Sequence, residues 1–266
     1  MIISIIGCGW FGLELGKSLV ADGYSVNGAT TTAGKLNSLQ EAGMAPYHIQ
    51  IAAQQEHLAD ASFFNCDVLV ITIPPKVHLH GADDYLLIQK RLIELAAAHS
   101  TKKIVFISST SVYGDVCSNV DEDTLPAADT LSGQTLLKAE SLYASTHAFR
   151  TTVLRFGGLV GPGRDPGRFF AGKRDIANGQ APVNLIHLQD CVGITREIIN
   201  KDLFGITINA CSPHHPSRKE FYTHASRQSG LAVPDFKDEL LGWKVVSSKI
   251  ISHHLRYDFQ FSNWLT

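Results

Sequence analysis

Short apolar runs alternate with segments of helical periodicity along the first part of this chain. Brief apolar runs rich in β-branched residues are typical of buried strands in a parallel sheet. The pattern predicts strands at residues 2–6, 24–29, 47–51, 68–71, 104–107 and from 152 onward, with helices near 11–21, 33–43, 88–96 and 133–146. This regular alternation predicts an α/β fold with a doubly wound parallel sheet and right-handed crossovers.

The pattern becomes less regular after residue 155. Residues 157–167 contain five glycines and two prolines, which predicts a loop at the carboxyl edge of the sheet, where ligands bind in such folds. Further elements are expected as helices near 190–200 and 217–229 and strands near 206–210 and 244–247. We therefore predict a larger domain over 1–155 and a smaller lobe over 156–266, which shares late strands with the first domain.

The first strand runs directly into a glycine-rich turn, Gly7-Cys8-Gly9-Trp10-Phe11-Gly12, which a helix follows. In a dinucleotide-binding turn Gly7 makes the tight bend, Gly9 lets the backbone approach a pyrophosphate, and Gly12 lets helix and strand pack closely. The helix amino terminus presents N–H groups and a positive dipole to the phosphates. A turn that merely joins two elements needs only one of these glycines. We therefore predict that this six-residue turn binds NAD(P) in a Rossmann-type domain, with Cys8 as a small filler beside the cofactor.

Composition and charge exclude several classes of partner. The formal net charge of −2 gives no electrostatic basis for binding nucleic acid or an anionic membrane. The five cysteines include no Cys-x-x-Cys pair, which favours reduced thiols in a cytoplasmic protein and argues against a zinc site. Neither a long apolar stretch nor a basic leader is present, so we expect no membrane span and no secretion. Adjacent histidines, as at 214–215 and 253–254, diverge on a strand or helix, and no metal site is expected.

The end of the second predicted strand bears on the choice of cofactor. NAD-binding folds place a carboxylate there to bind the ribose hydroxyls, whereas this chain has Thr30-Thr31-Thr32 followed by Lys35. A carboxylate would repel a 2′-phosphate, and hydroxyls with a nearby ammonium would accept one. Thr30, Thr31 and Lys35 therefore favour NADP over NAD. The alternative is that the threonines only cap the next helix.

Several motifs together resemble the extended short-chain dehydrogenase/reductase family, the NAD(P)-dependent nucleotide-sugar epimerases and dehydratases. They are the glycine turn, Ile107-Ser108-Ser109-Thr110-Ser111-Val112-Tyr113-Gly114, Lys138-Ala139-Glu140, Leu154-Arg155-Phe156-Gly157, Gly161-Pro162-Gly163 and Ile186-His187-Leu188-Gln189-Asp190. The resemblance covers nearly the whole chain. Pro74-Pro75 and the late segment 244–249 are similar to a compact, epimerase-like branch, and Pro74 is expected beside the cofactor.

The resemblance implies a role for each of three positions. A Ser or Thr after the fifth strand binds the substrate hydroxyl or carbonyl, a Tyr acts as general acid and base, and a Lys four residues later binds the nicotinamide ribose. Such a lysine favours the phenolate of a tyrosine that otherwise titrates near pH 10. Ser109 matches the serine and Lys138 the lysine, but Gln134 stands at the tyrosine position.

Gln134 leaves three interpretations open, because a carboxamide cannot be a general base, although it can hydrogen-bond a carbonyl or hydroxyl. In the first, the protein is an oxidoreductase or epimerase whose acid or base comes from elsewhere. The titratable candidates for that role are Tyr113, Tyr143, Cys117 and His187. In the second, the protein binds NADP and a ligand without turnover, as a sensor. In the third, another tyrosine occupies the site. The match of Lys138-Ala139-Glu140 to the family motif argues against this third interpretation.

The remaining polar candidates concern the substrate. Arg164 and Arg168 in the glycine-rich loop can grip a phosphate or carboxylate, and surface solvation explains them equally well. His187 is expected near the substrate, with Asp190 as a helix N-cap, and Arg155 as a buried structural ion pair. We therefore expect an NADP-dependent oxidoreductase or epimerase/dehydratase acting on a small molecule such as a nucleotide sugar. The alternative is a catalytically silent dinucleotide-binding protein, and the oligomeric state is left open.

Overall fold

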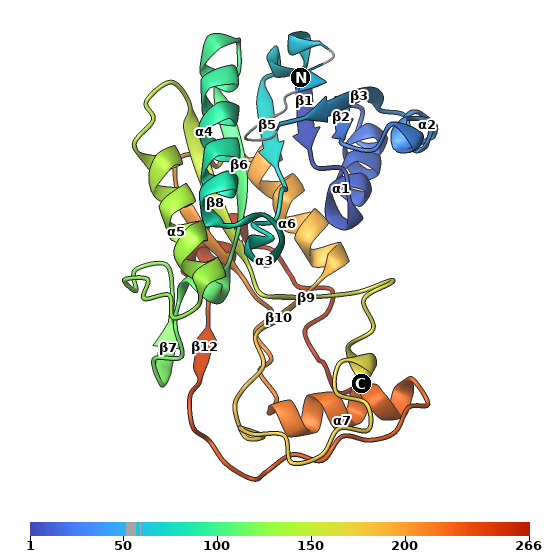
Figure 1. Cartoon of the computed structure of the whole chain (residues 1–266), viewed down its shortest axis with the longest axis vertical. Coiled ribbons are helices and arrows are strands. Elements are labelled where there is room, and N and C mark those ends of the chain that lie inside the picture. The colour runs from blue at the N-terminus through green and yellow to red at the C-terminus, as the bar shows by residue number, and fades with distance from the viewer. Residues whose placement is uncertain (52–56, 59) are drawn as a thin grey trace. The chain divides into compact units, whose positions relative to one another are not determined.

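A computed structural model of the protein describes residues 1–51, 57–58 and 60–266, and its main feature is an eight-stranded sheet (Figure 1). The strand order is β11-β8-β6-β5-β1-β2-β3-β4. The strands are β1 (Ile2–Ile6), β2 (Ser25–Thr30), β3 (Ala45–Gln50), β4 (His57–Leu58), β5 (Val68–Ile71), β6 (Lys103–Ser109), β8 (Arg150–Phe156) and β11 (Thr207–Ala210). The six strands expected in the first part of the chain are confirmed, as is the α/β fold, and β4 is an additional edge strand.

Parallel pairing and burial explain why the central strands read as continuous apolar runs. Strand β1 pairs in parallel with β2 on one side and β5 on the other, and β5 pairs in parallel with β6. Ile3, Ile5 and all four residues of β5 are fully buried, because helices cover the faces of such a sheet. The short edge strand β4 runs antiparallel to β3.

The helices connect the strands as the periodicity predicts. They are α1 (Trp10–Ala21), α2 (Leu36–Glu41), α3 (Val77–His80), α4 (Ala82–Ala98), α5 (Leu131–Ala144) and α6 (Leu188–Asn200), with 3₁₀ turns η1 (Ala33–Lys35) and η2 (Ala61–Phe64). Helices α4 and α5 lie side by side, and α5 also packs against β6 (Figure 1). Within the described ranges, no helix has both the length and the apolarity that a membrane span requires.

The chain forms two compact units, each discontinuous in sequence. The first comprises Met1–Ser109, Thr130–Arg155 and Val192–Ile208, and the second comprises Thr110–Asp129, Phe156–Cys191 and Asn209–Thr266. The first unit holds most of the large sheet and its helices. The last part of the sheet's strand β11 and the first residues of α6 belong to the second unit.

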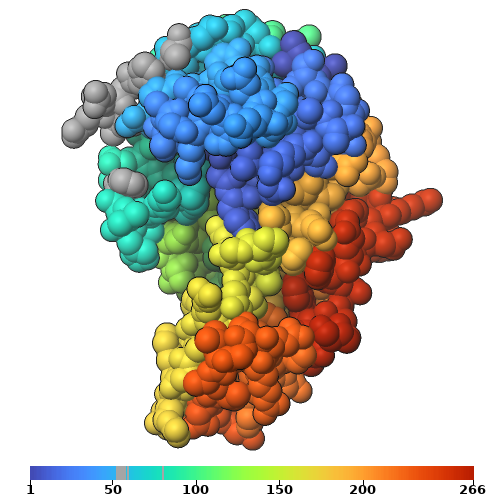
Figure 2. Space-filling view, turned by 90° about the vertical axis from the view of Figure 1, so that its right-hand side faces the viewer, coloured from blue at the N-terminus to red at the C-terminus, as the bar shows by residue number. Residues whose placement is uncertain are grey.

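Short elements make up the second unit. They are η3 (Thr110–Val112), β7 (Ser118–Val120), β9 (Gly158–Val160), η4 (Pro166–Arg168), β10 (Leu185–His187), α7 (Arg218–Gln228), β12 (Lys244–Val246) and a π-helical turn η5 (Ile251–Leu255). The prediction of a plain loop over 157–167 is wrong at β9, which pairs in parallel with β10. Figure 2 shows α7, in orange, against the yellow segment that contains η4; a Cβ on Gly167 would lie only 2.6 Å from the Ala225 carbonyl oxygen.

Candidate functional site

Four neighbouring strands of the first unit end at the same edge of the sheet. Since β2, β1, β5 and β6 are parallel neighbours, their carboxyl ends bring together the segments that follow them. These segments are the glycine turn after β1, Thr30 at the end of β2, Thr72 to Pro74 after β5, and Ser109 at the end of β6. The chain winds from β1 to β2 in one direction and later places β5 on the other side of β1. In open α/β sheets, ligands bind outside the carboxyl ends at such a switch point.

Local packing accounts for two of the three glycines in the turn. Gly7 has a φ of +98°, and its carbonyl accepts a hydrogen bond from Thr72 Oγ1 at 2.5 Å. A Cβ on Gly12 would lie 2.6 Å from the Gly7 carbonyl oxygen and 3.3 Å from Ile5 Cγ2, so α1 meets β1 only without a side chain there. Gly9 is different: it is exposed, and the nearest atom to a Cβ would be 3.9 Å away. Packing within the fold therefore does not require a glycine at position 9. The open space beside the Gly9 backbone fits a ligand-binding cradle that a side chain would fill.

The other residues of the turn are divided between the core and the start of α1. Phe11 is buried, whereas Trp10, the first residue of α1, is half-buried. Gly9 is the N-cap residue of α1 and has no side chain with which to hydrogen-bond the first helical amides. The Cys8 thiol is buried and donates to the Ile5 carbonyl at 3.4 Å. Burial raises the pKa of Cys8 to about 12, so it stays a thiol and is no nucleophile at neutral pH. Cys8 therefore fills space within the turn.

The end of β2 carries hydroxyl and ammonium groups. Thr30 is buried, and its Oγ1 accepts a hydrogen bond from the Thr32 amide at 3.2 Å. Thr31, Lys35 and Pro74 are exposed. Thr32, which precedes η1, makes no side-chain capping bond, so the alternative that the threonines cap the next helix is not what the structure shows.

Helix α5 presents the other predicted residues on one face. Gln134 and Lys138 are both exposed and are separated by one helical turn, whereas Thr135, Leu136, Ala139 and Glu140 are buried. Thr130 caps the helix by accepting a hydrogen bond from the Gly133 amide at 3.1 Å. Helix α5 packs against β6, the strand that ends at Ser109, through its buried face.

A buried ion pair fixes α5 to two strands. The Glu140 carboxylate accepts hydrogen bonds from Ser108 Oγ at 2.6 Å and from Arg155 Nε at 3.1 Å and Nη2 at 2.6 Å. The side chains of Arg155 and Glu140 are only 7% and 9% exposed. The expected ion pair of Arg155 is confirmed. Its partner is Glu140, on the buried face of α5. The signal in the sequence is a glutamate at an otherwise apolar position of the helix, in a chain whose next strand carries an arginine.

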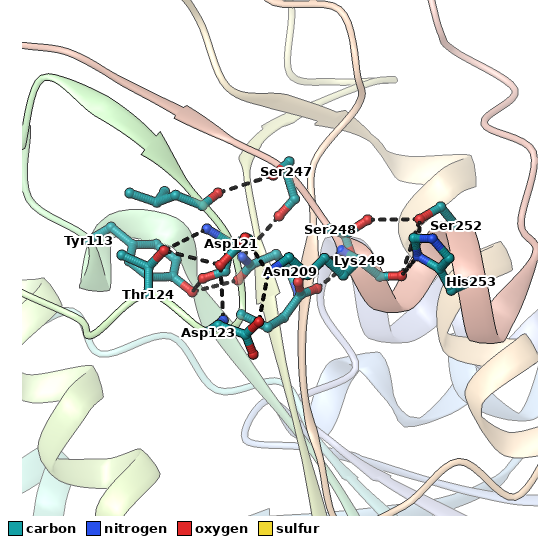
Figure 3. Close-up of polar contacts among 12 residues, drawn as sticks. Tyr113, Asp121, Asp123, Thr124, Asn209, Ser247, Ser248, Lys249, Ser252 and His253 are labelled. Atoms are coloured by element: carbon teal, nitrogen blue, oxygen red, sulfur yellow. Dashed lines mark hydrogen bonds and ion pairs between the residues drawn. The ribbon is translucent and has the colours of Figure 1, made fainter.

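The two candidate tyrosines have structural partners within their own units. Tyr143 is buried in the first unit and donates to Gln89 Oε1 at 2.8 Å, and burial raises the pKa of Tyr143 well above its ordinary value. Tyr113, in the second unit, is 1% exposed; its hydroxyl lies 2.9 Å from the Asp121 carbonyl oxygen and 3.1 Å from Asn209 Oδ1 (Figure 3). These contacts suit packing roles rather than proton exchange with a substrate.

The other predicted residues belong to the second unit. Arg164 and Arg168 are exposed, and Arg168 Nε lies 3.6 Å from an Asp165 carboxylate oxygen. Cys117 is exposed, with its thiol 3.7 Å from the Leu241 carbonyl oxygen. His187 is buried against Phe261, with ring centroids 3.5 Å apart, and burial lowers the pKa of His187.

Asp190 does not cap α6, so that expectation is wrong. The helix already begins at Leu188, and the Gln189 amide donates to His187 Nδ1 at 3.2 Å. The fully buried Asp190 carboxylate instead accepts bonds from the Tyr257 hydroxyl and the Gln260 and Phe261 amides, at 2.9, 2.8 and 3.2 Å. It anchors the carboxy-terminal segment, a long-range role that the local sequence does not reveal.

No group of three or more His, Cys, Asp and Glu side chains in the described part of the chain is placed to hold a metal ion. The candidate site thus consists of the sheet edge with Gly9, Thr30, Thr31, Pro74 and Ser109, together with the α5 face. Its exposed groups are backbone, hydroxyls, a carboxamide and ammonium groups. Such donors suit an anionic, hydroxyl-rich ligand, and the open backbone at Gly9 suits a pyrophosphate.

The fold and the sequence both have close counterparts. The structure of UDP-glucuronic acid 4-epimerase from Bacillus cereus in complex with NAD superposes with a TM-score of 0.79 at 21% identity, covering 100% of this chain and 96% of that chain. A functionally unknown conserved protein from Silicibacter pomeroyi gives a TM-score of 0.80 at 22% identity, with 99% and 95% covered. These likenesses establish the fold.

Sequence relatives add the family. Protein YeeZ of Escherichia coli K12 is 35% identical over 265 residues, which cover 97% of this chain and 96% of that protein. YtcB of Bacillus subtilis, described as an uncharacterized UDP-glucose epimerase, is 30% identical over 180 residues, 62% of this chain and 57% of that protein. The family model of the NAD dependent epimerase/dehydratase family matches residues 5–190. This chain therefore belongs to the NAD dependent epimerase/dehydratase family.

Proposed function

We propose that this protein is an NADP-dependent oxidoreductase or epimerase/dehydratase that acts on a nucleotide sugar. The observation that carries the proposal is the position of Gly9, Thr30 and Ser109 at the carboxyl ends of parallel strands of one sheet, with Lys138 exposed on the helix α5 that packs against β6. Gly9 supports it most, because the fold itself leaves room there for a side chain.

In this proposal each residue has a defined task. The glycine turn and the amino terminus of α1 hold the pyrophosphate, Thr30, Thr31 and Lys35 the adenosine ribose phosphate, and Lys138 the nicotinamide ribose. When bound, the nicotinamide supplies hydride exchange with a carbon of the substrate. Ser109 and Gln134 hydrogen-bond the oxygen on that carbon and orient it, and the proton of that oxygen exchanges with water, because neither side chain is a base near neutral pH.

The substrate class and the preference for NADP rest on different observations. Relatives named as UDP-sugar epimerases support a nucleotide sugar. The structure of the Bacillus cereus enzyme contains NAD. In this chain, however, no carboxylate lies between Gly23 and Gln40, where Lys35 is the one charged residue, and this supports NADP.

A catalytically silent, dinucleotide-binding protein is the second candidate, and Gln134 is the observation that favours it. A carboxamide cannot take or give a proton in the pH range of the cell, and both candidate tyrosines are buried. Under this alternative the same residues hold the cofactor, and a ligand binds without turnover. Cofactor fluorescence with a panel of nucleotide sugars and small carbonyl compounds separates the two candidates.

Lys138→Ala is expected to weaken NADP binding, and any turnover, by about 10- to 150-fold, because a charged hydrogen bond contributes about 1.5–3 kcal/mol. Lys102→Ala is the matched control, since Lys102 is an exposed lysine of the same unit before β6. Turnover that is unaffected in Lys138→Ala would refute the assignment. Cofactor binding with no redox change for any compound, and no gain in Gln134→Tyr, would establish the silent alternative instead.

A further inference from the structure

A histidine on the neighbouring strand faces the end of β2. His48 on β3 is the register partner of Thr30, and its ring nitrogen Nε2 lies 3.3 Å from the Thr31 carbonyl oxygen. The side chain is half-buried. The imidazole is therefore held against the short segment that leads out of β2 toward Lys35.

The chemistry around this segment is that of a site for a phosphate. The side chains of Thr31, Thr32 and Lys35 are exposed along it, and no carboxylate lies between Gly23 and Gln40 in the sequence. Imidazole contributes N–H donors and, when protonated, a positive charge.

We infer that His48 is a specificity-determining residue that binds the 2′-phosphate of NADP together with Thr31 and Lys35. The inference rests on the proposed function, which puts the adenosine ribose at the end of β2. It adds a residue of the neighbouring strand β3 to the site. The sequence motif at the end of β2 does not include this residue. Because NAD has a hydroxyl at this position and no phosphate, His48 is expected to distinguish the two cofactors without contributing much to NAD.

The test is calorimetric titration of the full chain with NADP and, separately, with NAD. His48→Ala is expected to weaken NADP binding about tenfold and to change NAD binding less than twofold, and His48→Gln, which keeps a donor without the charge, to fall between. Adenosine 2′-monophosphate should lose affinity in parallel with NADP, whereas adenosine 5′-monophosphate should not.

His99→Ala is the matched control. Its ring Nδ1 lies 2.8 Å from the Leu95 carbonyl oxygen, a similar imidazole–carbonyl contact, but the residue precedes β6 and so lies at the opposite, amino edge of the sheet. It should leave both dinucleotide affinities unchanged. Thermal unfolding of each variant confirms that the fold is retained.

The outcomes separate the inference from the proposed function. If the wild-type protein prefers NADP and Lys35→Ala removes that preference, but His48→Ala affects neither cofactor or both equally, the inference is wrong and the proposed function stands. If the wild-type protein prefers NAD, or binds neither dinucleotide, the cofactor part of the proposed function fails and the inference fails with it.

Discussion

Arg155→Met is expected to lower the free energy of unfolding by about 3–5 kcal/mol, the range measured when one partner of a buried ion pair is removed. In this variant the Glu140 carboxylate stays buried and loses both hydrogen bonds from the guanidinium. The hydrogen bond from Ser108 Oγ remains. Water cannot replace the guanidinium without opening the packing between α5, β6 and β8. Urea denaturation followed by far-UV circular dichroism measures the loss.

The matched control removes both charges. In the double variant Arg155→Met with Glu140→Leu, no buried charge is left unpaired, and apolar replacement of a buried pair is often neutral or stabilising. The double variant should therefore be more stable than Arg155→Met alone by about 2 kcal/mol or more. An Arg155→Met protein within about 1 kcal/mol of wild type would mean that the pair does not hold α5 in place.

Asp190→Ala is expected to have the second largest effect, by releasing the carboxy-terminal segment 257–264. Hydrogen bonds to a charged acceptor contribute about 1.5–3 kcal/mol each, and Asp190 accepts three of them from that segment. Because such contributions are not additive, we expect a loss of about 3 kcal/mol or more. The amides of Gln260 and Phe261 should then exchange with solvent much faster, as hydrogen exchange followed by mass spectrometry would measure.

Ser212→Ala provides the comparison for Asp190. Its hydroxyl donates to the Phe261 carbonyl oxygen at 2.9 Å, a single neutral bond to the same segment, so its removal should cost only about 1 kcal/mol. Asp190→Asn, which keeps one acceptor oxygen, should lie between the two. Unchanged exchange across 257–264 in Asp190→Ala would show that apolar packing, including the stacking of Phe261 on His187, anchors the segment without the carboxylate.

The sequence predicts the large sheet well, because buried parallel strands and amphipathic helices leave strong periodic patterns. It also predicts the ion pair of Arg155, since a charge inside an apolar strand needs a partner. The glycine turn can be located from the sequence. Only the structure distinguishes Gly12, where packing requires a glycine, from Gly9, where packing does not require one.

The second unit is harder to predict, because its short strands depend on distant partners. Three-residue β7 pairs with β12, more than 120 residues later in the chain, and β9 pairs with β10 across a long irregular stretch. Neither pairing leaves a periodic pattern in the sequence, because the paired strands are short and lie far apart along the chain. The role of Asp190 and the position of His48 depend on distant partners in the same way. A helix start near Asp190 suggests a local cap, although its partners lie about 70 residues away, and the proximity of His48 to the end of β2 follows only from strand register.

The most direct test of the cofactor assignment is calorimetric titration of NADP and NAD into wild-type protein and Gly9→Ala. We predict that wild-type protein binds NADP more tightly than NAD. Gly9→Ala should unfold at nearly the wild-type temperature, because a Cβ there meets no atom within 3.8 Å, yet bind both dinucleotides at least about tenfold more weakly, since the methyl group would occupy the place of the pyrophosphate. Wild-type affinity in a correctly folded Gly9→Ala protein, or no binding of either dinucleotide to wild type, would contradict the assignment.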